Sequence, residues 1–265
     1  MKILYRASLL ILCVANFWGN AAAAATDKPF EPILGQEGKD VVWVPTPPVL
    51  VEKMLDIAQL TPQDFVMDLG SGDGRNIIAA AKRGAHALGV EYNPDMVELS
   101  RRTAEKEGVA DKARFMQGDM YEADISKASV MALFLLPENL NKLAPKFLAL
   151  KPGSRIVANQ FAVSGWEPDE SGIADGDCGS WCTWLLYIVP APVAGRWCLQ
   201  KGELELEQKF QMLNGIFTAD GVSVPVENGR LRGDQISFMV GSVEYSGRVN
   251  ADAMEGSGWT AKRMP

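Results

Sequence analysis

The residues best placed to do chemistry lie in one short stretch and in a carboxylate that follows it. An apolar, β-prone run ends on Asp68 and is followed by Gly70, Gly72 and Gly74, after which a helical pattern begins. Glycines carry no Cβ, so a ligand can approach the backbone amides at the start of a helix. A second apolar run ends on Glu91, whose carboxylate can accept hydrogen bonds from both hydroxyls of a ribose. The spacing therefore predicts a nucleotide-binding unit.

The glycine spacing distinguishes between cofactors. A dinucleotide fingerprint, Gly-x-Gly-x-x-Gly, needs its third glycine where this chain has Arg75. The pattern present, Asp-x-Gly-x-Gly-x-Gly, resembles the first motif of class I S-adenosylmethionine (AdoMet) methyltransferases. AdoMet has no pyrophosphate, and an acidic residue such as Asp68 can meet its charged amino-acid tail. AdoMet is therefore the predicted cofactor, and the alternative is a tight turn in an α/β domain.

Strand and helix patterns alternate around this motif. The predicted strands are 65–69, 87–91, 113–117, 130–136, 155–160 and 181–189, and the predicted helices are 49–60, 76–83, 93–107 and 137–150. Residues 164–180 have the composition of a loop. Regular alternation with short links predicts an α/β fold with a doubly wound, mostly parallel sheet, whose ligands bind at the carboxyl edge of the strands.

The N-terminus predicts a signal peptide at residues 1–25. Lys2 and Arg6 precede an apolar run at 7–18, and a small-residue stretch suited to cleavage follows at 21–25. An exported, periplasmic protein is expected, with a membrane anchor formed by an uncleaved N-terminus as the alternative. Residues 26–48, rich in proline and glycine, are predicted to form an extension and lid before the domain at 49–192.

The C-terminal part, residues 193–265, has a different pattern. Apolar and polar residues alternate, and turns are predicted at Asn214-Gly215, Asp220-Gly221 and Gly233-Asp234. These features predict a small antiparallel β unit that serves in recognition or dimerisation, or as a structural cap. No acid–base constellation is evident in it.

The net charge and the cysteine and histidine content argue against several classes of function. The net charge is −7, and loss of Lys2 and Arg6 with the leader leaves 24 basic against 33 acidic residues, a net charge of −9. Such an acidic chain is a poor candidate for binding nucleic acid, whereas a basic protein partner is electrostatically easier. Three cysteines follow the leader and allow one bridge, either Cys178 with Cys182 or one of them with Cys198. With one histidine in the chain, no metal site or histidine-based hydrolase is expected.

A family resemblance covers about residues 41–190. The segments Val44-Pro-Thr-Pro47, Asp68 to Arg75, Gly89 to Pro94, Gly118-Asp119 and Leu135 to Glu138 resemble a bacterial group of class I methyltransferases. That group is similar to the mitochondrial lysine methyltransferases that modify subunits of ATP synthase and related carriers. The resemblance implies methyl transfer to a protein lysine, or to another protein or small-molecule amine.

The resemblance also implies roles for single residues. Asp68 and the backbone of 70–74 would hold the methionine moiety, Glu91 the ribose hydroxyls and Asp119 the adenine amino group. Tyr92 would flank the adenine, and Pro45 and Thr46 would form part of the lid. The predicted cofactor-binding residues are Pro45, Thr46, Asp68, Gly70, Ser71, Gly72, Asp73, Gly74, Glu91, Tyr92, Asp119, Met120 and Leu136.

The resemblance places Leu136, Pro137 and Glu138 in an acceptor-holding loop. This loop lacks the Asn-Pro-Pro-Tyr form, which argues against adenine or glutamine amides as acceptors. A lysine must lose a proton before it attacks, and Glu138 is the predicted catalytic base, with a plain place in a helix's first turn as the alternative. The competing functional hypothesis is an exported, non-catalytic AdoMet-fold module that binds through its C-terminal β unit.

Overall fold

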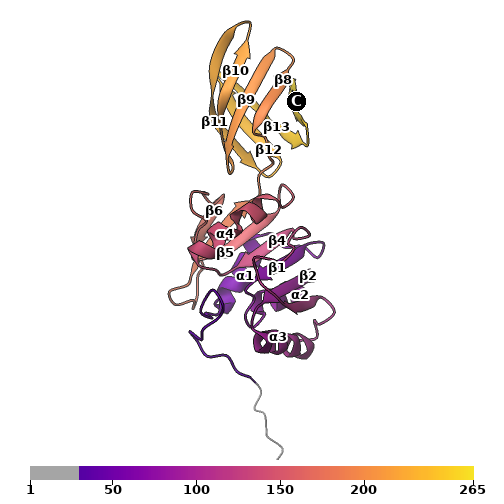
Figure 1. Ribbon diagram of the computed structural model, residues 1–265, viewed down its shortest axis with the longest axis vertical. Helices are drawn as coiled ribbons and strands as arrows, with labels where there is room; N and C mark the ends of the chain where they lie inside the picture. Colours follow the sequence, from indigo (N-terminus) through magenta and orange to yellow (C-terminus); the bar gives the residue numbers. More distant parts are fainter. Residues whose placement is uncertain (1–29) are drawn as a thin grey trace, which may run out of the picture.

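The computed structural model describes residues 30–265, so the predicted signal peptide lies outside the described residues. An α/β domain and a β-barrel lie at opposite ends of the long axis (Figure 1). Within residues 30–265, every helix is too short or too polar to cross a membrane.

The α/β domain contains a seven-stranded sheet and four helices. The strands are β1 (Phe65–Leu69), β2 (His86–Glu91), β3 (Ala113–Gln117), β4 (Val130–Leu133), β5 (Arg155–Asn159), β6 (Glu170–Ile173) and β7 (Thr183–Ile188). The helices are α1 (Pro48–Ile57), α2 (Arg75–Lys82), α3 (Pro94–Lys106) and α4 (Pro137–Leu148).

The strand order, β3-β2-β1-β4-β5-β7-β6, places β1 at the centre of the sheet. Every neighbouring pair from β3 to β5 is parallel, whereas β7 runs antiparallel to both β5 and β6. The chain reverses its winding direction at β1 and β4, and ligands bind at such a switch point in doubly wound sheets. The predicted parallel sheet is confirmed, and the candidate residues lie at its carboxyl edge.

Alternate residues of β1 face two separate cores. Val66 packs with buried residues of α1, α2 and α3 on one face, while Met67 and Leu69 pack with α4 on the other. This alternation follows from the two-residue period of a strand. Asp68 shares the face of Val66, which directs its carboxylate toward α2.

Two sequence-based boundaries in this domain were wrong. The strand predicted at 130–136 ends at Leu133, because the following residues form the connection to Pro137, the first residue of α4. Residues 164–180 were expected to form a loop, but they contain the short edge strand β6, which pairs with β7. A four-residue edge strand with mostly exposed side chains has little apolar periodicity to reveal it.

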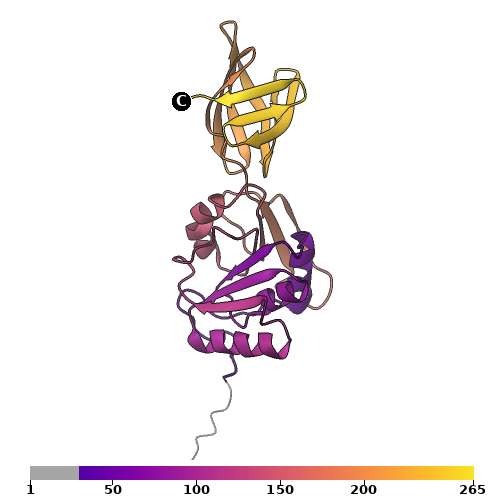
Figure 2. The ribbon, with the colours of Figure 1, turned by 90° about the vertical axis from the view of Figure 1, so that its right-hand side faces the viewer.

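The C-terminal part is larger and more regular than the predicted small β unit, because its eight antiparallel strands form a closed barrel (Figure 2). Closure results from pairing of the first strand with the last, which leaves no free edge. Leu204, Phe238 and Met254 are among the buried residues of the barrel interior. The strands are β8 (Gly195–Leu199), β9 (Gly202–Lys209), β10 (Met212–Ala219), β11 (Val222–Arg232), β12 (Gln235–Val240), β13 (Val243–Asn250), β14 (Ala253–Gly256) and β15 (Trp259–Arg263).

Two of the three turns predicted in this region are confirmed, at Asp220-Gly221 and Gly233-Asp234. The third was wrong, because Asn214 and Gly215 lie inside β10. A Cβ on Gly215 would lie 2.1 Å from the carbonyl oxygen of Glu205, so this glycine permits close strand approach rather than a turn.

The barrel contacts the α/β domain through stacked aromatic rings and hydrogen bonds. Trp166 stacks on Phe210 with ring centroids 5.1 Å apart. The backbone amide of Ala191 donates to the carbonyl of Gly233 over 2.8 Å. Arg230 of β11 lies 3.3 Å from a carboxylate oxygen of Asp169, whose side chain is fully buried. These contacts hold one end of the barrel against the α/β domain.

Candidate active site

The glycine-rich turn joins β1 to α2 and brings its backbone against β2. The amides of Gly70 and Ser71 both donate to the carbonyl of Val90, over 2.8 and 3.1 Å. Gly74 precedes α2 with a φ of 79°, and a Cβ there would lie 2.6 Å from the ring of Phe115. Glycine is therefore required at this position by both backbone conformation and space.

Glu91 ends β2 and is fixed by the backbone on either side of it. One carboxylate oxygen accepts from the amide of Gly72 and the other from the amide of Asn93, each over 2.9 Å. An ionised carboxylate has about four lone-pair sites, so two remain for ribose hydroxyls. The role of Glu91 as the ribose contact stays a prediction that this acceptor capacity supports.

Asp68 is a buried carboxyl group with a single hydrogen-bond donor. Its side chain accepts from Nδ2 of Asn76 over 3.0 Å, and the residue is 3% exposed. Burial raises its pKa well above the usual value, and the negative charges of Glu91 and Asp73 add to that shift. A buried carboxylate next to two other acids attracts a cation, such as the ammonium group of a methionine moiety.

Asp119 lies at the other end of the site, close to Tyr92 and Lys39. Asp119 accepts from the backbone amide of Tyr121 over 2.8 Å and forms an ion pair with Lys39. The Lys39 hydrogen bond and the Tyr121 amide hold the pKa of Asp119 below its usual value. The ammonium of Lys39 also lies 5.0 Å from the ring centroid of Tyr92. Both predicted adenine contacts are therefore engaged by one lysine.

Two cavities separate the N-terminal segment from this sheet edge. Val44 and Pro45 cover the methionine end, and Trp43 approaches Gly72 so closely that a Cβ there would lie 2.7 Å from its indole nitrogen. Of the predicted cofactor residues, Gly70, Glu91, Tyr92, Asp119 and Met120 line one cavity, and Pro45, Thr46, Asp68, Gly70, Ser71, Gly72 and Asp73 line the other.

A third, mostly apolar cavity of about 110 Å³ opens beside the first two. We call it the acceptor slot, after the role that we propose for it below; it is lined by Val41, Val42, Val44, Phe134, Leu135, Leu136, Phe161 and Trp181. Its aromatic wall consists of Phe134, Phe161 and Trp181, whose ring centroids lie 5.4 to 6.3 Å apart. Phe134 and Val44 line all three cavities, so the cavities meet at these two side chains.

Three predicted residues lie outside the two cofactor cavities. Gly74 shapes the turn from behind, and Leu136 lines the acceptor slot instead. Glu138 is exposed in the first turn of α4 and lines none of the cavities described above, so its role as base stays a prediction.

Sequence reasoning missed the residues that complete the site. Asn76, which binds Asp68, looked like an ordinary first-turn helix residue. Phe134 and Trp181 fell within the predicted strands 130–136 and 181–189, Phe161 followed the predicted strand 155–160, and Lys39 lay in the predicted extension at 26–48. The one available signal was Trp43, because its neighbours Val44 and Pro45 already belonged to the predicted lid.

The site fits AdoMet by its donors and acceptors. The buried Asp68 has one partner where an ammonium could supply a second, and Ser71 Oγ and Asn76 Oδ1 are buried without any partner. Glu91 retains free acceptor capacity for a ribose, and Asp119 offers an acceptor for an amino group. Phe134 stands where the methionine and adenosine ends meet, which is where the sulfonium would lie.

The sheet order, the glycine turn after β1 and the acid that ends β2 together define a class I AdoMet-dependent methyltransferase. Residues 68–170 match the family model described as the ANTKMT methyltransferase domain. A protein-lysine N-methyltransferase from Saccharolobus islandicus (strain REY15A) is 41% identical over 153 residues, which are 56% of this chain and 94% of that protein. The chain belongs to this methyltransferase family.

Two further relatives show the range of the similarity. A lysine N-methyltransferase of Rattus norvegicus, named for its action on an ATP synthase subunit, is 36% identical over 130 residues, and the match covers 49% of this chain and 60% of the rat protein. A crystal structure of an RNA methyltransferase from Salinibacter ruber in complex with S-adenosyl-L-homocysteine is 41% identical, with a TM-score of 0.53. It covers 57% of this chain and 96% of the Salinibacter chain.

Proposed function

We propose that this methyltransferase transfers the AdoMet methyl group to the side-chain amine of a protein lysine. The observation that carries the proposal is the acceptor slot, an apolar cavity with an aromatic wall that shares Phe134 with both cofactor cavities. The relatives from Saccharolobus islandicus and rat, both named as lysine methyltransferases, support the same acceptor class.

The slot suits a lysine because of what burial does to an amine. A lysine stem is a chain of methylenes, which apolar walls such as Val42 and Leu136 can bury. Desolvation favours the neutral form of the ammonium, and only the neutral amine carries the lone pair that attacks. Bound AdoMet supplies an already activated methyl group on a sulfonium. The protein then has to exclude water, favour loss of the proton from the lysine amine, and align the amine with the methyl group.

The aromatic wall also suits the product. A methylated amine is more apolar than the starting lysine yet still takes up a positive charge. Aromatic faces attract such cations, by about 0.5 to 2 kcal/mol depending on how far the site is desolvated. Phe134, Phe161 and Trp181 would therefore favour the charge that develops on nitrogen during transfer.

The named activity of the Salinibacter ruber protein makes RNA the competing acceptor. The composition of this chain disfavours it, because 33 acidic residues exceed 26 basic ones. Phosphate contacts require clustered lysine and arginine, which a net charge of −7 does not provide. A basic protein segment is the better electrostatic match, and the exposed acids Glu203, Glu205 and Glu207 on β9 add to that match.

We also propose that the protein works outside the cytoplasm. Export through the predicted leader at 1–25 would bring the chain to an oxidising compartment, and the Cys178–Cys182 disulfide supports such a destination.

The test compares matched acceptors with the full chain and methyl-labelled AdoMet. Basic peptides that differ only by lysine or arginine at one position, and an RNA of random sequence, would be incubated in parallel. We expect label on the lysine peptide alone, in a form that acid hydrolysis releases as methylated lysine. Label on RNA, or equal label on the arginine peptide, would overturn the proposal.

A further inference from the structure

The acceptor slot has one wall that comes neither from the N-terminal lid nor from the segments that follow β4 and β5. That wall is Trp181, which lies in the connection between β6 and β7, from Ala174 to Cys182. The indole contacts the ring of Phe134 at 5.4 Å and that of Phe161 at 6.2 Å between centroids. Trp181 itself lines the acceptor slot and neither cofactor cavity, whereas Phe134, which it contacts, lines all three cavities.

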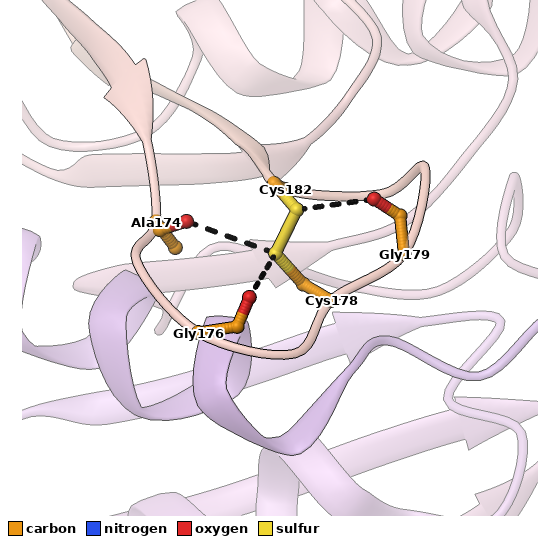
Figure 3. Close-up of a disulfide and its surroundings, with 5 residues drawn as sticks. All are labelled: Ala174, Gly176, Cys178, Gly179 and Cys182. Carbon is orange, nitrogen blue, oxygen red and sulfur yellow. Dashed lines mark hydrogen bonds between the residues drawn. A yellow bond between two sulfur atoms is a disulfide. The ribbon is translucent and has the colours of Figure 1, made fainter.

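A disulfide closes this connection directly beside Trp181. Figure 3 shows the bond between Cys178 and Cys182. Their Cα atoms lie 5.2 Å apart. The sulfur of Cys178 lies 3.7 Å from the carbonyl oxygen of Ala174 and 3.6 Å from that of Gly176. The bond therefore folds the connection back on itself around a buried sulfur.

Two backbone hydrogen bonds accompany the disulfide within the connection. The amide of Trp181 donates to the carbonyl of Cys178 over 3.0 Å, and the amide of Ala174 donates to that of Cys182 over 2.9 Å. Gly176 and Gly179 have φ angles of 114° and 55°, which residues other than glycine rarely adopt. Glycines widen the conformational range of a chain once a cross-link is removed.

We propose that Trp181 is a specificity-determining wall of the acceptor slot and that the Cys178–Cys182 bond positions it there. The oxidation state of this cysteine pair then sets how tightly the acceptor is held and aligned, while the cofactor cavities are unaffected. The inference rests on the proposed lysine acceptor for its catalytic readout, but the position of the indole can be measured without any acceptor.

The redox step is a thiol–disulfide exchange. A dithiol thiolate attacks the sulfur of Cys182, which is half-buried, whereas Cys178 is 3% exposed. The protein S–S bond breaks, and the dithiol's second thiolate resolves the mixed disulfide. Two electrons and two protons pass from the dithiol to the cysteines, and the dithiol becomes a cyclic disulfide.

The kinetic experiment compares oxidised and dithiothreitol-reduced full chain with Trp181→Ala, Trp181→Phe and the double variant Cys178→Ser/Cys182→Ser. Cys198→Ser is the matched control, because Cys198 is an exposed free thiol on the barrel. We expect reduction and the double variant to raise the KM of a lysine peptide by about three- to thirty-fold, the range of a lost aromatic contact to a cation. The Kd of AdoMet should stay within about twofold, as should every parameter of the control.

Non-additivity separates positioning from general support. If the bond acts through the indole, reduction should not raise the KM of Trp181→Ala further, and Trp181→Phe should restore part of the affinity. If reduction weakens Trp181→Ala as much as the wild type, or changes AdoMet and peptide binding equally, the positioning role is wrong.

An acceptor-free readout keeps this inference distinct from the proposed function. Acrylamide quenching of the wild type minus that of Trp181→Phe reports the exposure of this one indole in the AdoMet-bound protein. We expect low quenching when oxidised and several-fold higher quenching after reduction. Equal quenching in both states would overturn the inference. A lysine peptide that stays unmethylated by the oxidised enzyme would overturn the proposed function alone.

Discussion

Replacing Asp68 by asparagine should make the protein without cofactor more stable and its AdoMet binding weaker. Asp68 is buried with one donor, and its pKa is raised well above the usual value by burial first and then by nearby acids. A carboxyl whose folded-state pKa is raised stabilises the fold below its unfolded pKa, and that stability is lost as the pH rises through the folded pKa. Asparagine has nearly the same shape as aspartate but cannot ionise, so the variant does not lose this stability at neutral pH.

Asp64 provides the matched control, because it is a second buried aspartate with the opposite shift. Burial opposes its ionisation, but hydrogen bonds from Ser129, the Thr61 amide and Arg155 hold the pKa of Asp64 below its usual value. Its stabilising effect is present above the unfolded pKa and is lost as the pH falls. Asp64→Asn should therefore destabilise the protein by about 1 to 3 kcal/mol at neutral pH, with unchanged AdoMet affinity.

The magnitudes for Asp68→Asn follow from one lost charged contact. A hydrogen bond to a charged group is worth about 1.5 to 3 kcal/mol, so AdoMet should bind about 10- to 150-fold more weakly. Each 1 kcal/mol gained in stability raises the melting temperature by about 2 to 4 °C for a chain of this size. Calorimetry measures both quantities, at pH 4 and pH 7.

The gain in melting temperature should shrink at pH 4, because Asp68 is then protonated in the wild type as well. A variant that binds AdoMet as tightly as the wild type would refute the assignment of Asp68 to the ammonium group. A variant that melts at a lower temperature than the wild type at pH 7 would refute the argument that the buried charge of Asp68 destabilises the fold.

Three more perturbations test separate parts of the structure. Glu91→Gln should weaken AdoMet binding by about 1.5 to 3 kcal/mol, and a calorimetric Kd within twofold of wild type would place the ribose elsewhere. Lys39→Ala should free the carboxylate of Asp119 and strengthen AdoMet binding by about two- to fivefold, the scale of an exposed ion pair; weaker binding would show that Lys39 helps to hold the cofactor. Arg230→Ala should lower the unfolding free energy by about 1 to 3 kcal/mol, because it removes the ion-pair partner of the buried Asp169; unchanged denaturant melts would contradict this.

Lys39→Ala and Arg230→Ala each have a matched control that removes a basic residue of another ion pair. Lys82→Ala breaks the exposed pair with Glu107 at the end of α2 opposite the glycine-rich turn, and should leave AdoMet affinity unchanged. Arg232→Ala removes a neighbouring barrel arginine whose partner, Glu170, is about half exposed. It should cost about 0 to 1 kcal/mol, less than Arg230→Ala.

The cofactor half of the site could be predicted because its chemistry coincides with strand ends. Asp68 and Glu91 each terminate an apolar run, and Gly70 to Gly74 fill a turn that the backbone geometry requires. Parallel strands bring such ends to one edge of the sheet, so residues that end separate strands lie close together in space. Asp119 follows β3 by two residues at the same edge, and its role was predicted from the family resemblance.

The acceptor half could not be predicted because its residues look like core. Phe134 and Phe161 follow buried strands, and an aromatic at such a place is usually packing. Trp181 reaches the slot only because a disulfide and a glycine-rich connection fold it back. Closure of the barrel depends on β8 pairing with β15, which are distant in sequence, and no local pattern indicates that contact.

The measurement that tests the central claim most directly is calorimetric titration of the full chain with AdoMet and with its demethylated product, S-adenosylhomocysteine. The geometry of Asp68, Glu91 and Asp119 predicts binding of both at micromolar strength, about −8 kcal/mol, and weaker binding in Asp68→Asn and Glu91→Gln. Absence of binding to either compound would mean that the cavities at the carboxyl edge of the sheet are not a working cofactor site.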